Sequence, residues 1–188
     1  QILEFLPADR MVRVQAGVVT EQLQNYAEQQ GMYYPVDFAS TGSSQIGGNI
    51  GTNAGGIKVI KYGMTRNWVL GLTVVTGKGD ILRLNKGMIK NATGYALQHL
   101  FIGGEGTLGL VTEVKLERQP QNLQVMVLGT PDFEAVMPVL HAFQKEIDLT
   151  AFEFFGEVAM QKVLDRGHVQ RPFETTCPFY VLLEFEAP

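Results

Sequence analysis

The sequence predicts an α+β protein of two domains, and three observations indicate this. Segments in which apolar and polar residues alternate, as in strands, are interspersed with segments of helical periodicity. Glycine-rich stretches interrupt the earlier part of the chain, whereas Phe, Met and Glu become frequent after the Arg-Gln-Pro sequence at 118–120. We therefore place a domain boundary near Gln119, which gives domains at 1–119 and 120–188.

The first domain begins with two strands and a helix. Residues 2–5 (ILEF) and 10–15 (RMVRVQ) are predicted strands joined by a Pro-Ala-Asp turn. Thr20 is the expected cap of a helix that continues to Gln30 and stops at Gly31. An extended stretch, YYPVDFAS, then leads into the first glycine-rich segment.

The later part of the first domain combines a hairpin with irregular structure. Residues 69–76 and 80–84 flank a Gly-Lys-Gly turn and predict a β-hairpin. Residues 91–102 (NATGYALQHLFI) are expected to form a short helix or an irregular segment, and a strand is expected after Leu108.

The second domain alternates strands and helices. Its predicted order is a strand at 123–129, a helix at 132–146, a strand at 151–155, a helix at 157–165 and a strand at 179–186. This order favours a layer of helices packed on a sheet. Because the last strand lies at the end of the sequence, we expect the sheet to be incomplete.

Composition and charge exclude several classes of function. A net charge of −4 without a run of Lys or Arg disfavours nucleic acid and anionic membranes as partners. The single cysteine, Cys177, excludes an internal disulfide and a cysteine-built zinc site, and indicates a reducing, cytoplasmic compartment. No apolar stretch reaches the roughly eighteen residues of a transmembrane segment. Because the chain begins at Gln1 rather than Met, we expect it to be a piece of a longer protein.

Residues 42–56, GSSQIGGNIGTNAGG, contain six glycines in fifteen positions. The apolar residues Ile46, Ile50 and Ala54 recur at every fourth position, which a flexible linker does not show. Two alternatives remain open: a structural loop with positive φ angles, and a loop whose backbone N–H groups approach a phosphate. A Walker A loop is excluded because Ile57 stands where that motif requires Lys.

Residues 104–109, GEGTLG, match the G-x-G-x-x-G pattern of dinucleotide-binding turns. That pattern must open a helix, whereas the following segment at 108–117 alternates like a strand. Glu105 would also put a carboxylate where a phosphate belongs. The residues therefore exclude both a P-loop and a Rossmann turn, and any dinucleotide would bind by another geometry.

Several motifs in correct order resemble a known family. They are Pro35, Asp37 and Ser40, the segment 42–56, KYG at 61–63, VLGL at 69–72 and KNATGYALQHLFIGGEGTLGLVTEVKL at 90–116. Together they are similar to the FAD-binding domain of the PCMH-type flavoproteins of the vanillyl-alcohol-oxidase superfamily. Within it they most resemble the D-2-hydroxyacid dehydrogenases, which include D-2-hydroxyglutarate, D-lactate and glycolate dehydrogenase FAD subunits. TAFEFF at 150–155 and PFYVLLEF at 178–185 resemble the start of the FAD-linked oxidase C-terminal domain.

The resemblance implies a fold and a set of cofactor contacts. Residues 1–119 would form the second subdomain of a PCMH-type FAD-binding domain, and 120–188 the truncated start of an α+β, ferredoxin-like substrate or cap domain. The implied FAD-binding residues are Pro35, Asp37, Ser40, Gly42, Ser43, Gly47, Gly48, Asn49, Gly51, Asn53, Ala54, Gly55, Gly56, Gly104, Glu105, Gly106, Gly109 and Val111. Gly55 and Gly56 would let the chain pass against the flavin ring. Glu105 is expected to be a structural carboxylate that collects loop N–H groups.

The resemblance also implies roles for individual groups in the first glycine-rich segment. The backbone N–H groups of Gly47, Gly48 and Asn49 are expected to serve the pyrophosphate oxygens. The side chains of Ser43, Asn49 and Asn53 are neutral hydrogen-bonding groups suited to phosphate and ribityl hydroxyls.

The implied activity is that of an FAD-dependent oxidoreductase. The whole enzyme would transfer a hydride from C2 of a D-2-hydroxy acid, such as D-2-hydroxyglutarate or D-lactate, to flavin N5, and pass electrons to a separate acceptor. The alternatives are an FAD-dependent oxidase that uses oxygen and a non-catalytic flavin-fold module.

The resemblance implies that the catalytic residues of the whole enzyme are not in this sequence. The family's catalytic and metal-binding segments lie elsewhere, so no catalytic or metal-ligating residue is assigned, and we expect the chain alone to be inactive. An apolar face that the rest of the protein normally covers would favour self-association. A peripheral association with the inner membrane, through the electron acceptor, stays open beside the cytoplasmic location.

Overall fold

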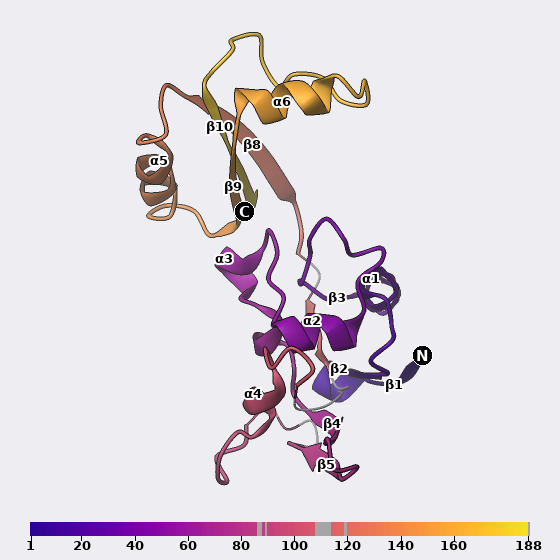
Figure 1. Cartoon of the computed structure of the whole chain (residues 1–188). Helices are drawn as coiled ribbons and strands as arrows, with labels where there is room; N and C mark the ends of the chain where they lie inside the picture. The colour runs from indigo at the N-terminus through magenta and orange to yellow at the C-terminus, as the bar shows by residue number, and fades with distance from the viewer. Residues whose placement is uncertain (86–87, 89, 108–113, 119, 188) are drawn as a thin grey trace. The chain divides into compact units, whose positions relative to one another are not determined.

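The computed structural model describes the 188-residue chain except for residues 86, 87, 89, 108–113, 119 and 188. It divides into two compact units, Gln1–Gln119 and Pro120–Pro188 (Figure 1). No helix in the described part of the chain is both long and apolar enough to cross a lipid bilayer.

Small sheets and short helices make up the first unit. Among its described residues, the strands form the sheets β1-β2-β6, β3-β7 and β4-β5, each with antiparallel pairing. The elements are β1 (Ile2–Leu6), η1 (Pro7–Asp9), β2 (Met11–Val14), α1 (Thr20–Gln29), β3 (Met32–Tyr33), α2 (Ile46–Thr52), α3 (Val59–Tyr62), η2 (Thr65–Asn67), β4 (Leu72–Val75), β5 (Ile81–Leu84), α4 (Gln98–Phe101), β6 (Val114–Lys115) and β7 (Glu117–Arg118). The predicted N-terminal strands and the β4-β5 hairpin are confirmed, whereas most of the strand predicted after Leu108 lies outside the described residues.

Helix α1 forms as predicted, but Thr20 does not cap it. Leu23 and Ala27, four residues apart, are buried on its inner face, and the chain leaves the helix at Gly31 with a φ of +67°. The N-cap residue is Val19, and Thr20 is the first helical residue. The buried hydroxyl of Thr20 bonds instead to Ser44, which ties α1 to the glycine-rich segment.

The core of the first unit lies between the sheets and helices α1 and α2. Its fully buried members include Val12 and Val14 from β2, Leu23 from α1, and Ile46 and Ile50 from α2. The four-residue spacing of Ile46 and Ile50 therefore marks the inner face of a helix.

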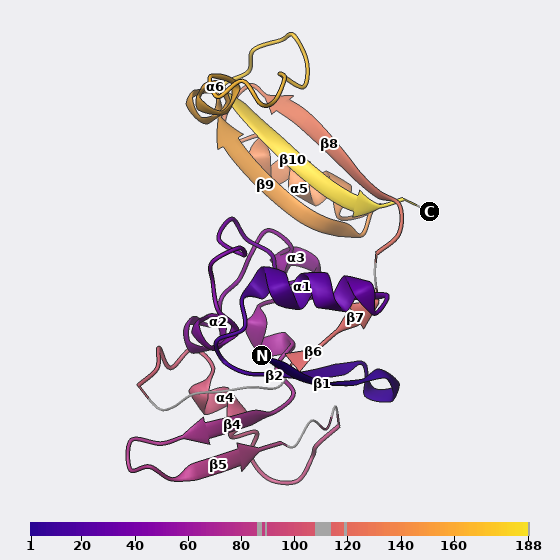
Figure 2. The ribbon, with the colours of Figure 1, turned by 90° about the vertical axis from the view of Figure 1, so that its right-hand side faces the viewer.

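The second unit is a three-stranded antiparallel sheet with the order β8-β10-β9 (Figure 2). Its elements are β8 (Leu123–Thr130), α5 (Val136–Phe143), β9 (Leu149–Gly156), α6 (Glu157–Leu164) and β10 (Phe179–Glu186). Val136 of α5 packs with Leu149, Val181 and Leu183 in the core on one face of the sheet. The predicted order is confirmed. Helix α5 is shorter than predicted at both ends, and before its N-terminal end the Asp132 carboxylate accepts the Ala135 N–H in a turn.

A polar network on α6 and β10 holds the connection between these elements. Both guanidinium Nη atoms of Arg171 donate to the Glu157 carboxylate, at 2.6 and 3.1 Å, and Nη1 also donates to the Tyr180 hydroxyl at 2.8 Å. The Tyr180 hydroxyl donates to Glu157 and accepts the Cys177 N–H. These hydrogen bonds, from Arg171 first and then Tyr180, lower the pKa of Glu157 from 4.5 to about 2.

Candidate functional site

The first glycine-rich segment folds around a short helix rather than as one continuous loop. Gln45 is the N-cap of α2, and Asn53 ends it in the left-handed conformation with a φ of +50°. Ile46 and Ile50 anchor α2 in the core. The prediction of a loop is therefore wrong for the centre of 42–56, where backbone hydrogen bonds and two buried side chains outweigh the low helix propensity of glycine.

Two of the three N–H groups expected to meet a pyrophosphate are used within the fold. Gly47 donates to the Ala16 carbonyl oxygen at 2.8 Å, and Asn49 donates to the Gln45 carbonyl oxygen at 2.9 Å. A Cβ at position 47 would also lie 2.8 Å from the Ala16 Cβ, so packing alone requires this glycine. Gly48 differs: it is exposed, nothing lies within 4 Å of a Cβ built there, and its N–H has no acceptor among the described residues.

The side chain of Asn49 faces the interior. It is 4% exposed, and its Nδ2 donates to the Thr20 hydroxyl at 2.6 Å. The same hydroxyl lies 2.7 Å from the Ser44 hydroxyl oxygen. Asn49 thus links α1 and α2, and the interpretation of its side chain as a phosphate or ribityl contact does not agree with this position.

The stretch before α2 is a tight, exposed turn. The N–H groups of Ser43 and Ser44 both donate to the Ser40 carbonyl oxygen, at 3.0 and 2.9 Å. The Ser43 hydroxyl contacts the same oxygen at 3.3 Å. Ser40, Gly42 and Ser43 are all exposed, so this turn presents small residues to the surface.

The end of the segment is shaped by contacts with the chain itself. The Asp37 carbonyl oxygen accepts the Ile57 N–H at 3.0 Å, and a Cβ on Gly56 would overlap that carbonyl group. Close approach of two backbone segments therefore explains Gly56. Pro35 is buried and Asp37 half-buried beside this contact.

Residues 53–55 are fastened to the segment at 64–66. Asn53 Oδ1 accepts the Arg66 N–H at 2.9 Å, so this amide oxygen is also used within the fold. The Ala54 carbonyl oxygen accepts both the N–H of Thr65 at 2.9 Å and its hydroxyl at 2.7 Å. A Cβ on Gly55 would lie only 3.1 Å from a Val59 methyl carbon.

Backbone hydrogen bonds join the two glycine-rich segments. The Gly103 N–H donates to the Ile50 carbonyl oxygen at 2.9 Å, and the Glu105 N–H donates to the Gly51 carbonyl oxygen at 2.7 Å. A Cβ on Gly51 would lie 3.6 Å from the Gly106 nitrogen. These bonds use two carbonyl groups of the last turn of α2, where helical partners run out; the Ile50 carbonyl oxygen also accepts the Asn53 N–H at 3.1 Å. Segments about 50 residues apart in the sequence thus form one surface.

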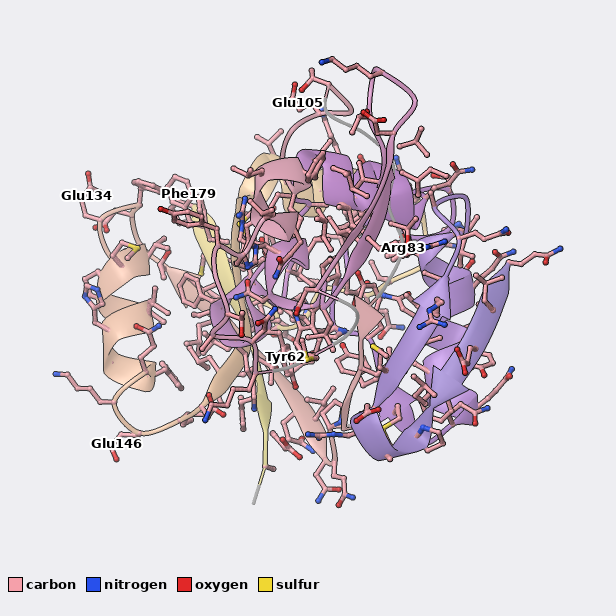
Figure 3. The ribbon with its side chains drawn as sticks, turned by 90° about the horizontal axis from the view of Figure 1, so that it is seen from below. Tyr62, Arg83, Glu105, Glu134, Glu146 and Phe179 are labelled. Carbon is pink, nitrogen blue, oxygen red and sulfur yellow. The ribbon has the colours of Figure 1, made fainter. Side chains whose placement is uncertain are left out.

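The second segment turns sharply at Glu105 and Gly106, whose φ angles are +49° and +75°. The Gly104 carbonyl oxygen accepts the Thr107 hydroxyl at 2.6 Å. Glu105 is exposed (Figure 3), and its carboxylate accepts no hydrogen bond from the described residues. The expectation that it collects loop N–H groups is therefore wrong for this part of the chain. Gly109 and Val111 lie outside the described residues.

Two family descriptions cover most of the sequence. Residues 1–85 match the FAD binding domain, and residues 119–188 match the C-terminal domain of FAD linked oxidases. The chain belongs to the FAD-linked oxidases. Both descriptions name FAD, the cofactor of this family.

Curated relatives of this chain are longer than the chain itself. A D-2-hydroxyglutarate dehydrogenase of Stutzerimonas stutzeri is 71% identical over 100% of this chain and 41% of that protein. One of Xanthomonas citri pv. viticola is 51% identical over 98% of the chain and 39% of that protein. A glycolate oxidase subunit of Bacillus subtilis is 36% identical over 100% of the chain and 40% of that protein. The chain thus spans about 40% of the length of these relatives.

A solved structure has the same fold. An alkyldihydroxyacetonephosphate synthase superposes with a TM-score of 0.77 and 24% identity, over 100% of this chain and 37% of that one. The predicted α+β architecture, an FAD-binding domain followed by the C-terminal domain of FAD linked oxidases, is confirmed.

One residue of the site was not predicted. Arg66 Nη2 donates to the Ile102 carbonyl oxygen at 2.8 Å, and Nη1 donates to the His99 carbonyl oxygen at 3.3 Å. Burial, and then the Arg66 charge, lower the pKa of His99. No local motif marks Arg66, because its acceptors lie 33 and 36 residues further along the chain.

Proposed function

We propose that the protein of which this chain is a part is an FAD-dependent dehydrogenase of D-2-hydroxy acids, and that the chain contributes part of its FAD site. The observation that carries this proposal is the 71% identity, along the whole chain, to a protein named D-2-hydroxyglutarate dehydrogenase. The glycolate oxidase subunit among the relatives supports the same class of substrate, since glycolate also has a hydroxyl group next to a carboxylate.

The exposed surface shared by the two glycine-rich segments is the part that would hold FAD. Ser40, Gly42, Ser43 and Gly48 are small and exposed, and the turn at 104–106 lies against the end of α2. Small residues leave the backbone accessible, as a polyanionic cofactor requires. The Gly48 N–H, which has no acceptor among the described residues, is the donor that best fits a phosphate oxygen.

The remaining residues of the predicted set would maintain this surface. We infer that Gly47 and Gly56 permit close packing, that Asn49 ties the middle of α2 to α1, and that Asn53 fixes the C-terminal end of α2 through internal hydrogen bonds. The same supporting role is proposed for Pro35, Asp37, Gly51, Ala54 and Gly55.

The chain's own part in the reaction would be to bind and orient the cofactor. When bound, FAD supplies the acceptor for the hydride from C2 of the substrate. In the described residues no three or more His, Cys, Asp or Glu side chains are arranged to hold a metal ion. The substrate base, the substrate-binding groups and the separate electron acceptor belong to the proposal for the whole protein.

Anaerobic reduction of the bound flavin tests this function. The purified whole protein is mixed with D- or L-2-hydroxyglutarate, and the loss of flavin absorbance is followed with time. We expect rapid bleaching by the D enantiomer and little by the L enantiomer. Reduction only by L-2-hydroxy acids, or only by aromatic alcohols, would contradict the proposed substrate class. Peroxide formed in stoichiometric amount when oxygen is admitted would support an oxidase instead.

A further inference from the structure

We propose that Arg66 is a positioning residue for FAD, whose guanidinium group holds the second glycine-rich segment against the first. This inference rests on the proposed function, because it assumes that both segments contact the cofactor. Arg66 would not touch FAD itself; it would act through the backbone of residues 99–106.

The backbone of Arg66 is fixed at the end of α2. Its N–H donates to Asn53 Oδ1 at 2.9 Å, and Asn53 is the residue that ends α2. The neighbouring Thr65 is bound through its N–H and hydroxyl to the Ala54 carbonyl oxygen. The backbone from which the Arg66 side chain extends is thus hydrogen-bonded to the first glycine-rich segment.

The far end of the side chain binds the second segment. Nη2 donates to the Ile102 carbonyl oxygen at 2.8 Å, and Nη1 to the His99 carbonyl oxygen at 3.3 Å. His99 lies in the four-residue helix α4 and Ile102 is its C-cap residue, and a cation favourably satisfies carbonyl groups at a helix C-terminus. The guanidinium group therefore fixes the point where the chain leaves α4 for the glycine-rich turn.

Among the described residues, two further hydrogen bonds join this turn to α2. Residues 103–107 are joined to α2 by the N–H groups of Gly103 and Glu105. Gly103 has a φ of +84°, and a Cβ built there would lie 3.7 Å from Arg66 Nη2, so the guanidinium group packs directly beneath the first residue of the turn. Without it, residues 99–106 would have more freedom to move relative to Gly48, and FAD would have to order them on binding.

The geometry requires arginine rather than any cation. The two Nη atoms of a planar guanidinium reach two carbonyl oxygens at once, whereas a lysine ammonium at the same place is a point donor. Arg66→Lys should therefore keep part of the contribution of this residue to FAD binding. Arg66→Met, which keeps the aliphatic volume but has no donor, should keep none of it.

The test compares Arg66→Met, Arg66→Lys and Arg83→Met in the whole protein. Arg83 is an exposed arginine on β5 that is outside both glycine-rich segments in the sequence, and it is the matched control. FAD is removed and titrated back, while the dissociation constant, the visible circular dichroism of bound flavin and the thermal midpoint of the apoprotein are measured. Since two hydrogen bonds from a charged donor are lost, we expect R66M to weaken FAD binding about tenfold or more. R66K should be intermediate and R83M unchanged.

Each outcome decides the proposal. Altered flavin dichroism in R66M, with partial recovery in R66K and similar apoprotein midpoints, supports positioning. Unchanged FAD affinity in R66M overturns it. The proposal is also overturned if the thermal midpoint of the R66M apoprotein falls enough to explain the whole loss of FAD affinity, because Arg66 would then only stabilise the first unit. If R66M does not fold, wild-type affinity in R66K overturns the proposal. A wild-type protein that binds no FAD would instead overturn the proposed function.

Discussion

Replacing Gly48 by alanine should make the chain more stable and the cofactor site worse. Gly48 lies within α2, and nothing lies within 4 Å of a Cβ built there, so a methyl group meets no steric resistance. Glycine inside a helix costs about 0.5–1 kcal/mol relative to alanine, so the free energy of unfolding should rise by about that amount. The same methyl group would stand where the backbone must approach a phosphate, so FAD affinity should fall.

The neighbouring glycine supplies a matched control. A Cβ at position 47 lies 2.8 Å from the Ala16 Cβ and 3.2 Å from its carbonyl oxygen, so Gly47→Ala should lower the free energy of unfolding by about 1–3 kcal/mol. Urea denaturation of the 188-residue chain measures the two stabilities. Titration of FAD into the apo form of the whole protein measures the affinities of wild type and Gly48→Ala.

Two results would refute this reasoning. If Gly48→Ala binds FAD as tightly as wild type, the cofactor does not approach the backbone at this residue. If Gly48→Ala loses as much stability as Gly47→Ala, then Gly48 does not lie in open space on a helix.

Other predictions follow from the contacts described above. Gly56→Ala places a Cβ on the Asp37 carbonyl group and should cost at least about 1–3 kcal/mol in urea denaturation; a wild-type midpoint would contradict this. Asn49→Ala removes the bond to the buried Thr20 hydroxyl and should cost about 1–2 kcal/mol, and an unchanged free energy of unfolding would rule out the bond. Hydrogen bonding lowers the pKa of Glu157 from 4.5 to about 2, so its stabilising effect is complete above about pH 4.5 and is lost as the pH falls towards 2. Glu157→Gln should weaken this dependence of the free energy of unfolding on acid pH. An unchanged pH profile would show that Glu157 does not cause it. The 188-residue chain alone should show almost no thermal shift with excess FAD, and purification of a yellow chain with near-stoichiometric FAD would contradict the proposed need for the rest of the protein.

Regular elements with a clear period could be predicted from the sequence, whereas α2 could not. Alternation identifies the β4-β5 hairpin, and the spacing of Leu23 and Ala27 identifies α1. In α2, glycine and asparagine have low helix propensity, and the helix forms because tertiary contacts stabilise it. The four-residue repeat of the buried Ile46 and Ile50 is the sequence signal of this helix, and the glycine content of the segment obscures it.

The sequence locates the candidate site but does not assign roles within it. The sequence does not distinguish Gly47, Gly48 and Gly56 from one another. In the structure, Gly47 packs against Ala16 and Gly56 against Asp37, so a side chain has no room at either position. Gly48 alone among the three faces open space. These packing partners lie 19 or more residues away, so local reasoning cannot find them. Asn49 and Arg66 illustrate the same limit, because their hydrogen-bond partners come from other segments of the fold.

A crystal structure of the whole protein with FAD bound would test the central claim most directly. The account predicts that the pyrophosphate lies against the exposed backbone at Gly48, with the turn at 104–106 on the same side of the cofactor. It also predicts that Asn49 remains bonded to Thr20 and that Arg66 remains bonded to the Ile102 carbonyl group. FAD bound elsewhere, with the Gly48 N–H facing solvent and residues 104–106 away from the cofactor, would contradict the account.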